Sequence, residues 1–147
     1  MVAHPGFAAT DADIAYSAAR RLAAIGRVAL RRDPEVELID PARAWMALRR
    51  RRPDTAAGAE HAEIERRLRQ VFERVELILT PTTPCEPHGH DGPGDRVGTE
   101  LTWTFNLTGH PALSLPAGFT ASGLPVGLQV VARRHHDHLL PSAADAG

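Results

Sequence analysis

Histidine, cysteine and serine are the residues of this 147-residue chain that could ligate a metal or attack a substrate. The imidazoles fall into two groups with neighbouring carboxylates: His88, His90, Asp91 and Asp95, then His135, His136, Asp137 and His138. Zinc accepts such ligands, but no HExxH, paired CxxC or HxHxDH spacing is present. We therefore predict no metal site, with the first group fixing its loop by hydrogen bonds and the second exposed to solvent.

The candidate nucleophiles lack activating neighbours in the sequence. Cys85 lies in a proline-rich segment, and only His88 is close enough along the chain to suggest a base. Ser114 stands between leucines, without the glycine-flanked turn of a nucleophile elbow. All 17 basic residues are arginine, so lysine chemistry, including Schiff bases and a phosphate-loop lysine, is excluded from these residues. We predict no catalytic residue and no cofactor.

Charge and composition favour a globular protein. The net charge is -1, which gives no electrostatic reason to expect nucleic acid or an anionic membrane as partner. The four arginines of Arg49–Arg52 could bind nucleic acid or phosphate, but such a run is more typical of a solvated helix end. A single cysteine, no signal-peptide pattern and no apolar run of membrane-spanning length predict a cytoplasmic location.

The elements that must position these side chains follow from hydrophobic periodicity. Apolar residues recur every three or four positions over 12–32, 41–50 and 59–74, which predicts amphipathic helices, and a short helix is expected over 100–108. Runs of apolar residues predict strands at 35–39, 75–79, 112–116 and 126–132. The segment 80–98 is too rich in proline and glycine for regular structure, and a final helix should stop at Pro141.

This order of elements predicts an α/β fold: a partial mixed β-sheet covered by helices. Residues 53–60 are small and rich in helix breakers, so a linker is expected there. It would separate a helix-and-strand segment, 1–58, from a second segment, 59–147, as parts of one incomplete domain.

Three stretches in order resemble the C-terminal part of the amidase signature family. They are LILTPTTP at 77–84, PHGHDGPG at 87–94, and the segment 101–140 with NLTGHPALSLPAG around Asn106 and GLPVGLQVV from Gly123. The preceding PEVELIDPARAW at 34–45 is compatible with the region upstream. The resemblance implies that the sheet corresponds to the C-terminal part of the amidase signature fold.

The family's chemistry, by this resemblance, belongs to residues that this sequence lacks. Its enzymes hydrolyse carboxamide C–N bonds with a Ser–cis-Ser–Lys triad in a glycine- and serine-rich stretch. Here the four serines are isolated and lysine is absent. We therefore expect the C-terminal fragment of an amidase, inactive alone, whose small-molecule amide substrate binds only when the missing N-terminal portion is supplied.

The resemblance also implies where a substrate pocket would lie. The candidates for the pocket lining are His88, His90, Thr99, Thr102, Trp103 and Asn106. Members of the family that use glutamine carry an acidic residue seven positions before the equivalent of Asn106, where it binds the substrate's ammonium group. Thr99 occupies that position, which argues against glutamine. His88 and His90 either contact substrate or brace their loop.

Two other classes of function stay open. The chain could be a non-catalytic binding or assembly module that pairs with another chain through an exposed sheet edge. It could also be an independent metal hydrolase that uses its histidines, which is the weakest of the three hypotheses. Strands that are apolar on both faces, with few helices to cover them, predict a bare edge and self-association unless a partner chain supplies the missing layer.

Overall fold

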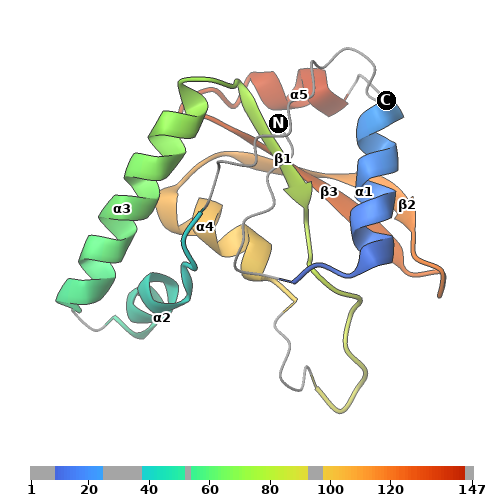
Figure 1. Ribbon diagram of the computed structural model, residues 1–147, viewed down its shortest axis with the longest axis horizontal. Helices are drawn as coiled ribbons and strands as arrows, with labels where there is room; N and C mark the ends of the chain where they lie inside the picture. The colour runs from blue at the N-terminus through green and yellow to red at the C-terminus, as the bar shows by residue number, and fades with distance from the viewer. Residues whose placement is uncertain (1–8, 25–37, 52–53, 93–97, 145–147) are drawn as a thin grey trace.

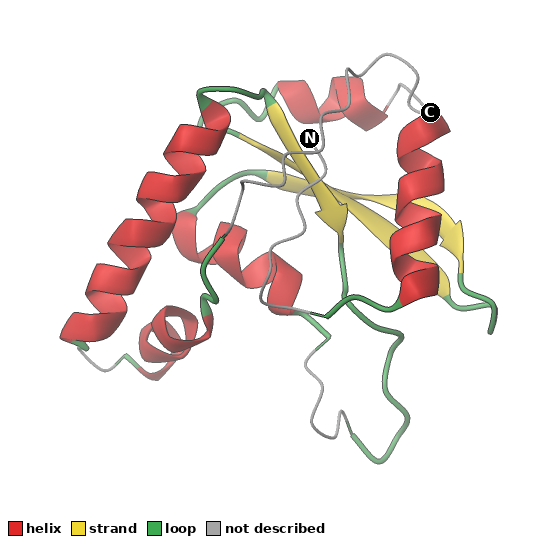
Figure 2. Ribbon diagram, in the orientation of Figure 1, coloured by secondary structure: helices red, strands yellow, loops and turns green. Residues whose placement is uncertain are grey.

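The computed structural model describes residues 9–24, 38–51, 54–92 and 98–144, and within them helices surround a small central sheet (Figures 1 and 2). The elements, in chain order, are α1 (Ala12–Ala24), α2 (Ala42–Arg50), α3 (Thr55–Phe72), β1 (Leu77–Pro81), α4 (Glu100–Thr108), β2 (Ala112–Phe119), β3 (Pro125–Ala132) and α5 (Leu139–Ala144). The predicted α/β class is confirmed. No helix among the described residues is long and apolar enough to cross a membrane.

The sheet has the strand order β1-β3-β2, with β3 in the centre. Both ladders are antiparallel: Leu79 of β1 and Leu113 of β2 lie opposite Val130 of β3. The expected mixture of parallel and antiparallel pairs is therefore not found among the described strands. The reason is connectivity, since β2 and β3 form a hairpin and β1 runs against β3.

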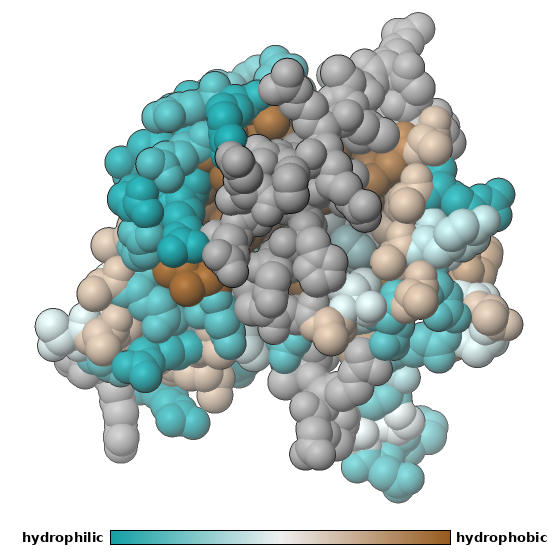
Figure 3. Space-filling view, in the orientation of Figure 1, coloured by the Kyte–Doolittle hydropathy of each residue, from teal (hydrophilic) through white to brown (hydrophobic). Residues whose placement is uncertain are grey.

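Alternate residues of the strands pack into two separate apolar clusters, one on each face of the sheet. Ile78 and Val131 face a cluster with α2, α3 and α4, to which Ile64, Leu68 and Phe72 contribute. Their neighbours Leu79 and Val130 face the opposite cluster, built with α1 and α5. Because side chains alternate between the two faces of a strand, each face of the sheet has its own layer of helices. Figure 3 shows that the outward surface of α3 is hydrophilic, as this layering requires.

Strand β2 differs from the other two in its exposure. Its inward residues Leu115 and Ala117 are buried, whereas Ala112, Ser114 and Pro116 are exposed. The strand is therefore open on one face, in line with the expected bare edge, although its outer face carries Ser114 and is not uniformly apolar. This strand lies at the edge of the sheet, and α4 covers the neighbouring strands rather than β2.

Helix α3 begins earlier than its apolar stripe suggested. The side chain of Asp54 accepts hydrogen bonds from the backbone N–H groups of Ala56 and Ala57, at 2.9 and 3.2 Å. This is an N-cap, and it turns residues 55–60, expected as linker, into the first turns of the helix. The division into segments 1–58 and 59–147 stays a prediction.

Other boundaries also shift. The helix predicted over 12–32 is described only to Ala24, and of the strand predicted over 35–39 only Leu38 and Ile39 are described, in non-strand backbone. The predicted strand 75–79 is found at Leu77–Pro81 instead. Helix α5 continues through Pro141, which lies in its first turn, where the missing proline N–H has no intrahelical partner to lose.

Candidate functional site

Four of the predicted pocket residues lie along helix α4 at helical spacing. Thr99 occupies the N-cap position, without a side-chain capping hydrogen bond, and Thr102, Trp103 and Asn106 follow one turn and two turns later. Thr102 Oγ1 donates to the Thr99 carbonyl at 2.8 Å, and Trp103 Nε1 donates to Thr99 Oγ1 at 3.1 Å. Asn106 Nδ2 lies 3.5 Å from Thr102 Oγ1, a weak contact. The structure therefore brings these four side chains into one polar row.

The indole rings of two helices support this row from one side. Trp103 of α4 stacks on Trp45 of α2, with ring centroids 6.1 Å apart and planes inclined by 19°. Helix α2 is in turn tied to α3, because the Ala44 N–H donates to Glu60 Oε1 at 3.3 Å. The position of Trp103 is thus set by packing between helices as well as by its bond to Thr99.

The strands add a second polar surface beside the first turn of α4. Gln129 Nε2 donates to Thr80 Oγ1 at 3.1 Å and lies 3.4 Å from the Leu101 carbonyl. Further along the same face, the hydroxyls of Thr82 and Ser114 are 2.6 Å apart. Sequence reasoning missed this group because its members come from three strands or their ends, and only the cross-strand register brings them together.

His88 and His90 lie in the loop that follows β1 and projects from the body of the molecule (Figure 1). Both side chains are exposed, and His88 Nδ1 bonds to the carbonyl of its neighbour Gly89 at 2.8 Å. Among the described contacts, neither imidazole meets the row on α4. Their role as substrate contacts stays a prediction, and so does the lining role of the four α4 residues.

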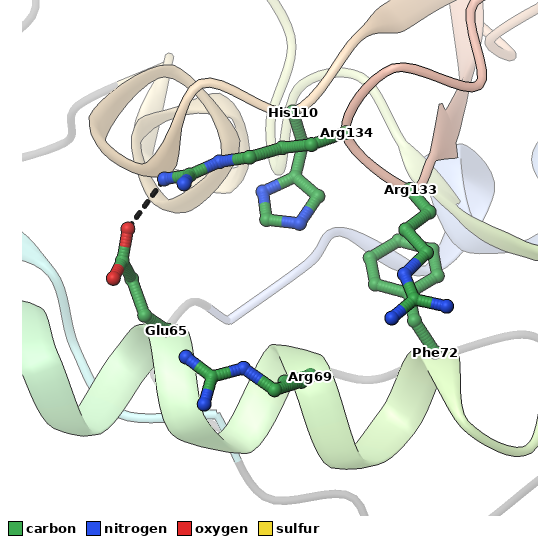
Figure 4. Close-up of a pocket in the computed structure, with 6 residues that line it drawn as sticks. All are labelled: Glu65, Arg69, Phe72, His110, Arg133 and Arg134. Carbon is green, nitrogen blue, oxygen red and sulfur yellow. Dashed lines mark hydrogen bonds and ion pairs between the residues drawn. The ribbon is translucent and has the colours of Figure 1, made fainter.

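A separate pocket lies beyond the other end of α4 (Figure 4). Its volume is about 130 Å³, and it is lined by Glu65, Arg69, Phe72, His110, Arg133 and Arg134. Arg134 Nε donates to the Thr108 carbonyl at 2.5 Å, and its guanidinium also pairs with Glu65. Sequence reasoning missed this pocket because its residues are spread over α3, the turn after α4 and the segment after β3, with no pattern that links them.

Burial controls the protonation of His110 in this pocket. Desolvation first, and the nearby Arg134 second, lower the pKa of His110 to about 4, although Glu65 opposes the shift. The ring stacks on Phe72 at 5.2 Å, and Nδ1 lies 2.8 Å from Thr108 Oγ1. Because that hydroxyl donates to the Thr104 carbonyl, Nδ1 must carry the ring proton, which leaves Nε2 as an acceptor in the neutral imidazole.

Metal ligation finds no support in the described part of the chain. Within residues 9–24, 38–51, 54–92 and 98–144, no group of three or more histidine, cysteine, aspartate or glutamate side chains could hold an ion. The rings of His136 and His138 lie 5.7 Å apart, but no third ligand of this kind joins them among those residues. Cys85 is a buried free thiol.

Comparison with known proteins agrees with this architecture. The chain is 41% identical over 80 residues to a subunit of the glutamyl-tRNA(Gln) amidotransferase of Psychrobacter sp., a match that covers 52% of this chain and 16% of that protein. The chain therefore spans about a sixth of that relative's length. The corresponding amidotransferase subunit of Cereibacter sphaeroides is 39% identical over 97 residues, 56% of this chain and 20% of that protein.

Solved structures show the same fold. One is the substrate complex of 6-aminohexanoate cyclic dimer hydrolase, with a TM-score of 0.68 and 20% identity over 99% of this chain and 43% of that one. Another is an inhibitor-bound vestigial protein complex related to the origins of an s-triazine catabolic enzyme, with a TM-score of 0.73, 15% identity and 99% and 41% coverage. The family model for amidases matches residues 12–140, and the chain belongs to the amidase family.

Proposed function

We propose that this chain forms one wall of the substrate pocket of an amidase that hydrolyses a carboxamide C–N bond. In this proposal, the nucleophilic serine, its partner serine and the lysine come from residues outside these 147. The chain on its own is inactive, since no residue in it can replace the lysine and no serine pair exists. The family match over 12–140 supports the reaction class.

The polar row on α4 is the observation that carries this proposal. Thr99, Thr102 and Asn106 present hydroxyl and amide groups along one side of the helix, and Trp103 provides an aromatic surface beside them. Such groups orient an amide by hydrogen bonding, but none of them can act as nucleophile or general base for its hydrolysis. The row suits a specificity wall rather than a catalytic centre.

The substrate class follows from the charge of this row. Thr99 is neutral, and its hydroxyl already accepts from Trp103 Nε1. The adjacent Glu100 is the first residue of α4, about 100° further round the helix than Thr99. An ammonium group that loses water in a pocket needs a carboxylate partner. We therefore assign a simple aliphatic or aromatic carboxamide without an ammonium group, and not glutamine, as the substrate.

Complementation tests both the inactivity of the chain alone and its assigned substrate class. The chain is co-expressed with a separate segment from an amidase relative that carries the Ser–cis-Ser–Lys residues, and ammonia release from propionamide and glutamine is measured. We expect activity only from the combination, with propionamide preferred. Thr99→Asp keeps a good helix-capping residue and restores the acidic group. It should shift the kcat/KM ratio toward glutamine by roughly tenfold, which corresponds to about 1.4 kcal/mol.

The matched control is Thr55→Asp, which adds the same charge at the first residue of α3. It should leave the substrate ratio unchanged. Ammonia release by the chain alone would contradict the inactivity. A ratio that responds equally to both aspartates would contradict the assignment of Thr99 to the pocket.

A second function, assembly through the sheet edge, is favoured by one observation. Phe119 at the end of β2 is 70% exposed, and β2 pairs only with β3 among the described strands. A partner strand could add to this edge and cover the ring. If the chain is such a module, Phe119→Ser should abolish self-association measured by light scattering, while Leu48→Ser, at an exposed leucine of α2, should not.

The proposed working compartment is the cytoplasm. The single cysteine is a buried free thiol, which needs no oxidising environment. Fractionation of cells that express the tagged protein tests this placement, and recovery with the membrane pellet would contradict it.

A further inference from the structure

We infer that the pocket between α3 and the segment after β3 binds a phosphate group, through Arg69 and Arg133 beside the fixed guanidinium of Arg134. This pocket is distinct from the polar row on α4, and nothing in the amidase reaction requires it. Figure 4 shows the three guanidinium groups and the His110 ring around one shared space.

The charge balance of the pocket favours a dianion. Three guanidinium groups stand against the single carboxylate of Glu65, which leaves an excess of two positive charges when His110 is neutral. A phosphate monoester carries a charge of about -1.5 to -2 at pH 7, whereas a carboxylate carries only one negative charge. The phosphate group therefore matches the pocket better than a carboxylate does.

Two of the three arginines are available to a ligand. Arg134 is already held by the Thr108 carbonyl and by Glu65, so its guanidinium is fixed at the pocket wall. Arg69 and Arg133 are exposed and form no ion pair among the described residues. Guanidinium groups bind phosphate oxygens through two parallel N–H donors, and neither arginine would have to give up an existing ion pair to do so.

Phe72 and His110 form one side of the pocket, with their rings stacked 5.2 Å apart. A bound phosphate would also favour protonation of His110 Nε2, which faces Glu65 and Arg69 from α3 and Arg133 and Arg134 from the segment after β3.

Titration calorimetry of the full 147-residue chain with inorganic phosphate, at constant ionic strength, tests this inference. We expect saturable binding of one phosphate per chain. Arg69→Met and Arg133→Met should each weaken it about tenfold, because each removes a charge-assisted contact. Glu65→Gln removes the opposing charge and should tighten it several-fold. A purely structural role for these residues does not produce effects of opposite sign.

The control variant is Arg49→Gln, at an exposed arginine of α2 outside the pocket. It should leave the affinity unchanged. A second readout is the imidazole proton resonance of His110, whose pKa should rise in phosphate and not in chloride of equal ionic strength. Glycerol 1-phosphate used in place of phosphate shows whether the group binds as an ester or only as the free ion.

No binding of either compound would overturn the inference. Equal weakening by Arg49→Gln and Arg133→Met would overturn it too, since the attraction would then be a general effect of positive charge. A His110 resonance that responds identically to phosphate and chloride would show that the anion is not in this pocket.

Discussion

The absence of a side chain at Gly127 allows the three strands to lie close together near Thr82 and Ser114. A methyl group on Gly127 would lie 2.6 Å from Thr82 Oγ1 and 2.7 Å from Ser114 Oγ. Those two hydroxyls are hydrogen-bonded to each other, with their oxygens 2.6 Å apart, and the Thr82 N–H donates to the Gly127 carbonyl at 2.9 Å. Glycine is therefore required here for close contact between β1, β2 and β3.

Gly127→Ala should lower the free energy of unfolding by roughly 1–3 kcal/mol, because the hydroxyl pair must separate to admit the methyl group. The matched control is Gly58→Ala in α3, where nothing lies within 4 Å of the added methyl group. That change should raise stability by about 0.5–1 kcal/mol through helix propensity. Urea unfolding of both variants measures the difference, and equal effects of the same sign would refute the steric account.

The protonation of His110 should make stability depend on pH. Its pKa is lowered from 6.5 to about 4, so between these values the unfolded chain binds the proton and the folded chain does not. The stabilisation is complete above pH 6.5 and is lost as the pH falls toward 4. Since the ring is partly exposed, we expect an effect of about 1 kcal/mol.

Urea unfolding across this pH range measures that slope, with His110→Gln as the comparison. The glutamine amide can still bond to Thr108 but does not titrate. Its pH dependence should be flatter than that of the original chain. Parallel curves for the two proteins would show that other groups, and not His110, cause any loss of stability in acid.

At the scale of elements, the cap of α3 places the longest helix of the described structure. Asp54→Ala removes both side-chain bonds to Ala56 and Ala57 and should cost about 1 kcal/mol. Asp54→Ser supplies another capping oxygen and should restore most of the loss. Chemical unfolding of the two variants separates a capping role from a general effect of charge, and identical losses would contradict it.

Periodicity predicted the elements well where one apolar stripe faces the core. The residues Ile64, Leu68, Val71 and Phe72 of α3 are buried as expected, whereas Val75, expected in the same stripe, lies beyond the helix and is partly buried. Helix α4 ends at Gly109, whose φ of 66° suits glycine. The boundaries were less predictable. After the Asp54 cap, the three alanines of 55–60 favour helix despite Gly58, so α3 starts there. Strand β1 extends through Thr80 to Pro81, and Thr80 is buried against Gln129.

The two candidate sites also differ in how far the sequence could predict them. The family resemblance supplied Thr99, Thr102, Trp103 and Asn106 as candidates, and their positions at the start of one helix and along it place them in a row. The pocket of Arg69, His110 and Arg133 depends on how α3, α4 and β3 pack together, and no local pattern encodes that arrangement. A bare edge was expected, but the strand that forms it could not be predicted, because a run such as ALSLP suits an edge strand and a central strand alike.

At the scale of the whole molecule, the described helices cover both faces of β1 and β3 but leave the outer face of β2 open. The chain spans only about a sixth to a fifth of the two amidotransferase subunits that it resembles. A surface that is open in these 147 residues is thus available for other parts of an amidase. This arrangement agrees with a chain that shapes a pocket and leaves the chemistry to residues elsewhere.

Intact-mass analysis after treatment with a serine-directed fluorophosphonate shows whether any serine of this chain is a nucleophile. The probe is added to the 147-residue chain mixed with the complementing segment that carries the Ser–cis-Ser–Lys residues. We expect one adduct on the complementing segment and none on this chain, whether it is alone or in the mixture. Stoichiometric labelling of any of its four serines, Ser114 included, would contradict the claim that this chain supplies a wall of the pocket and no nucleophile.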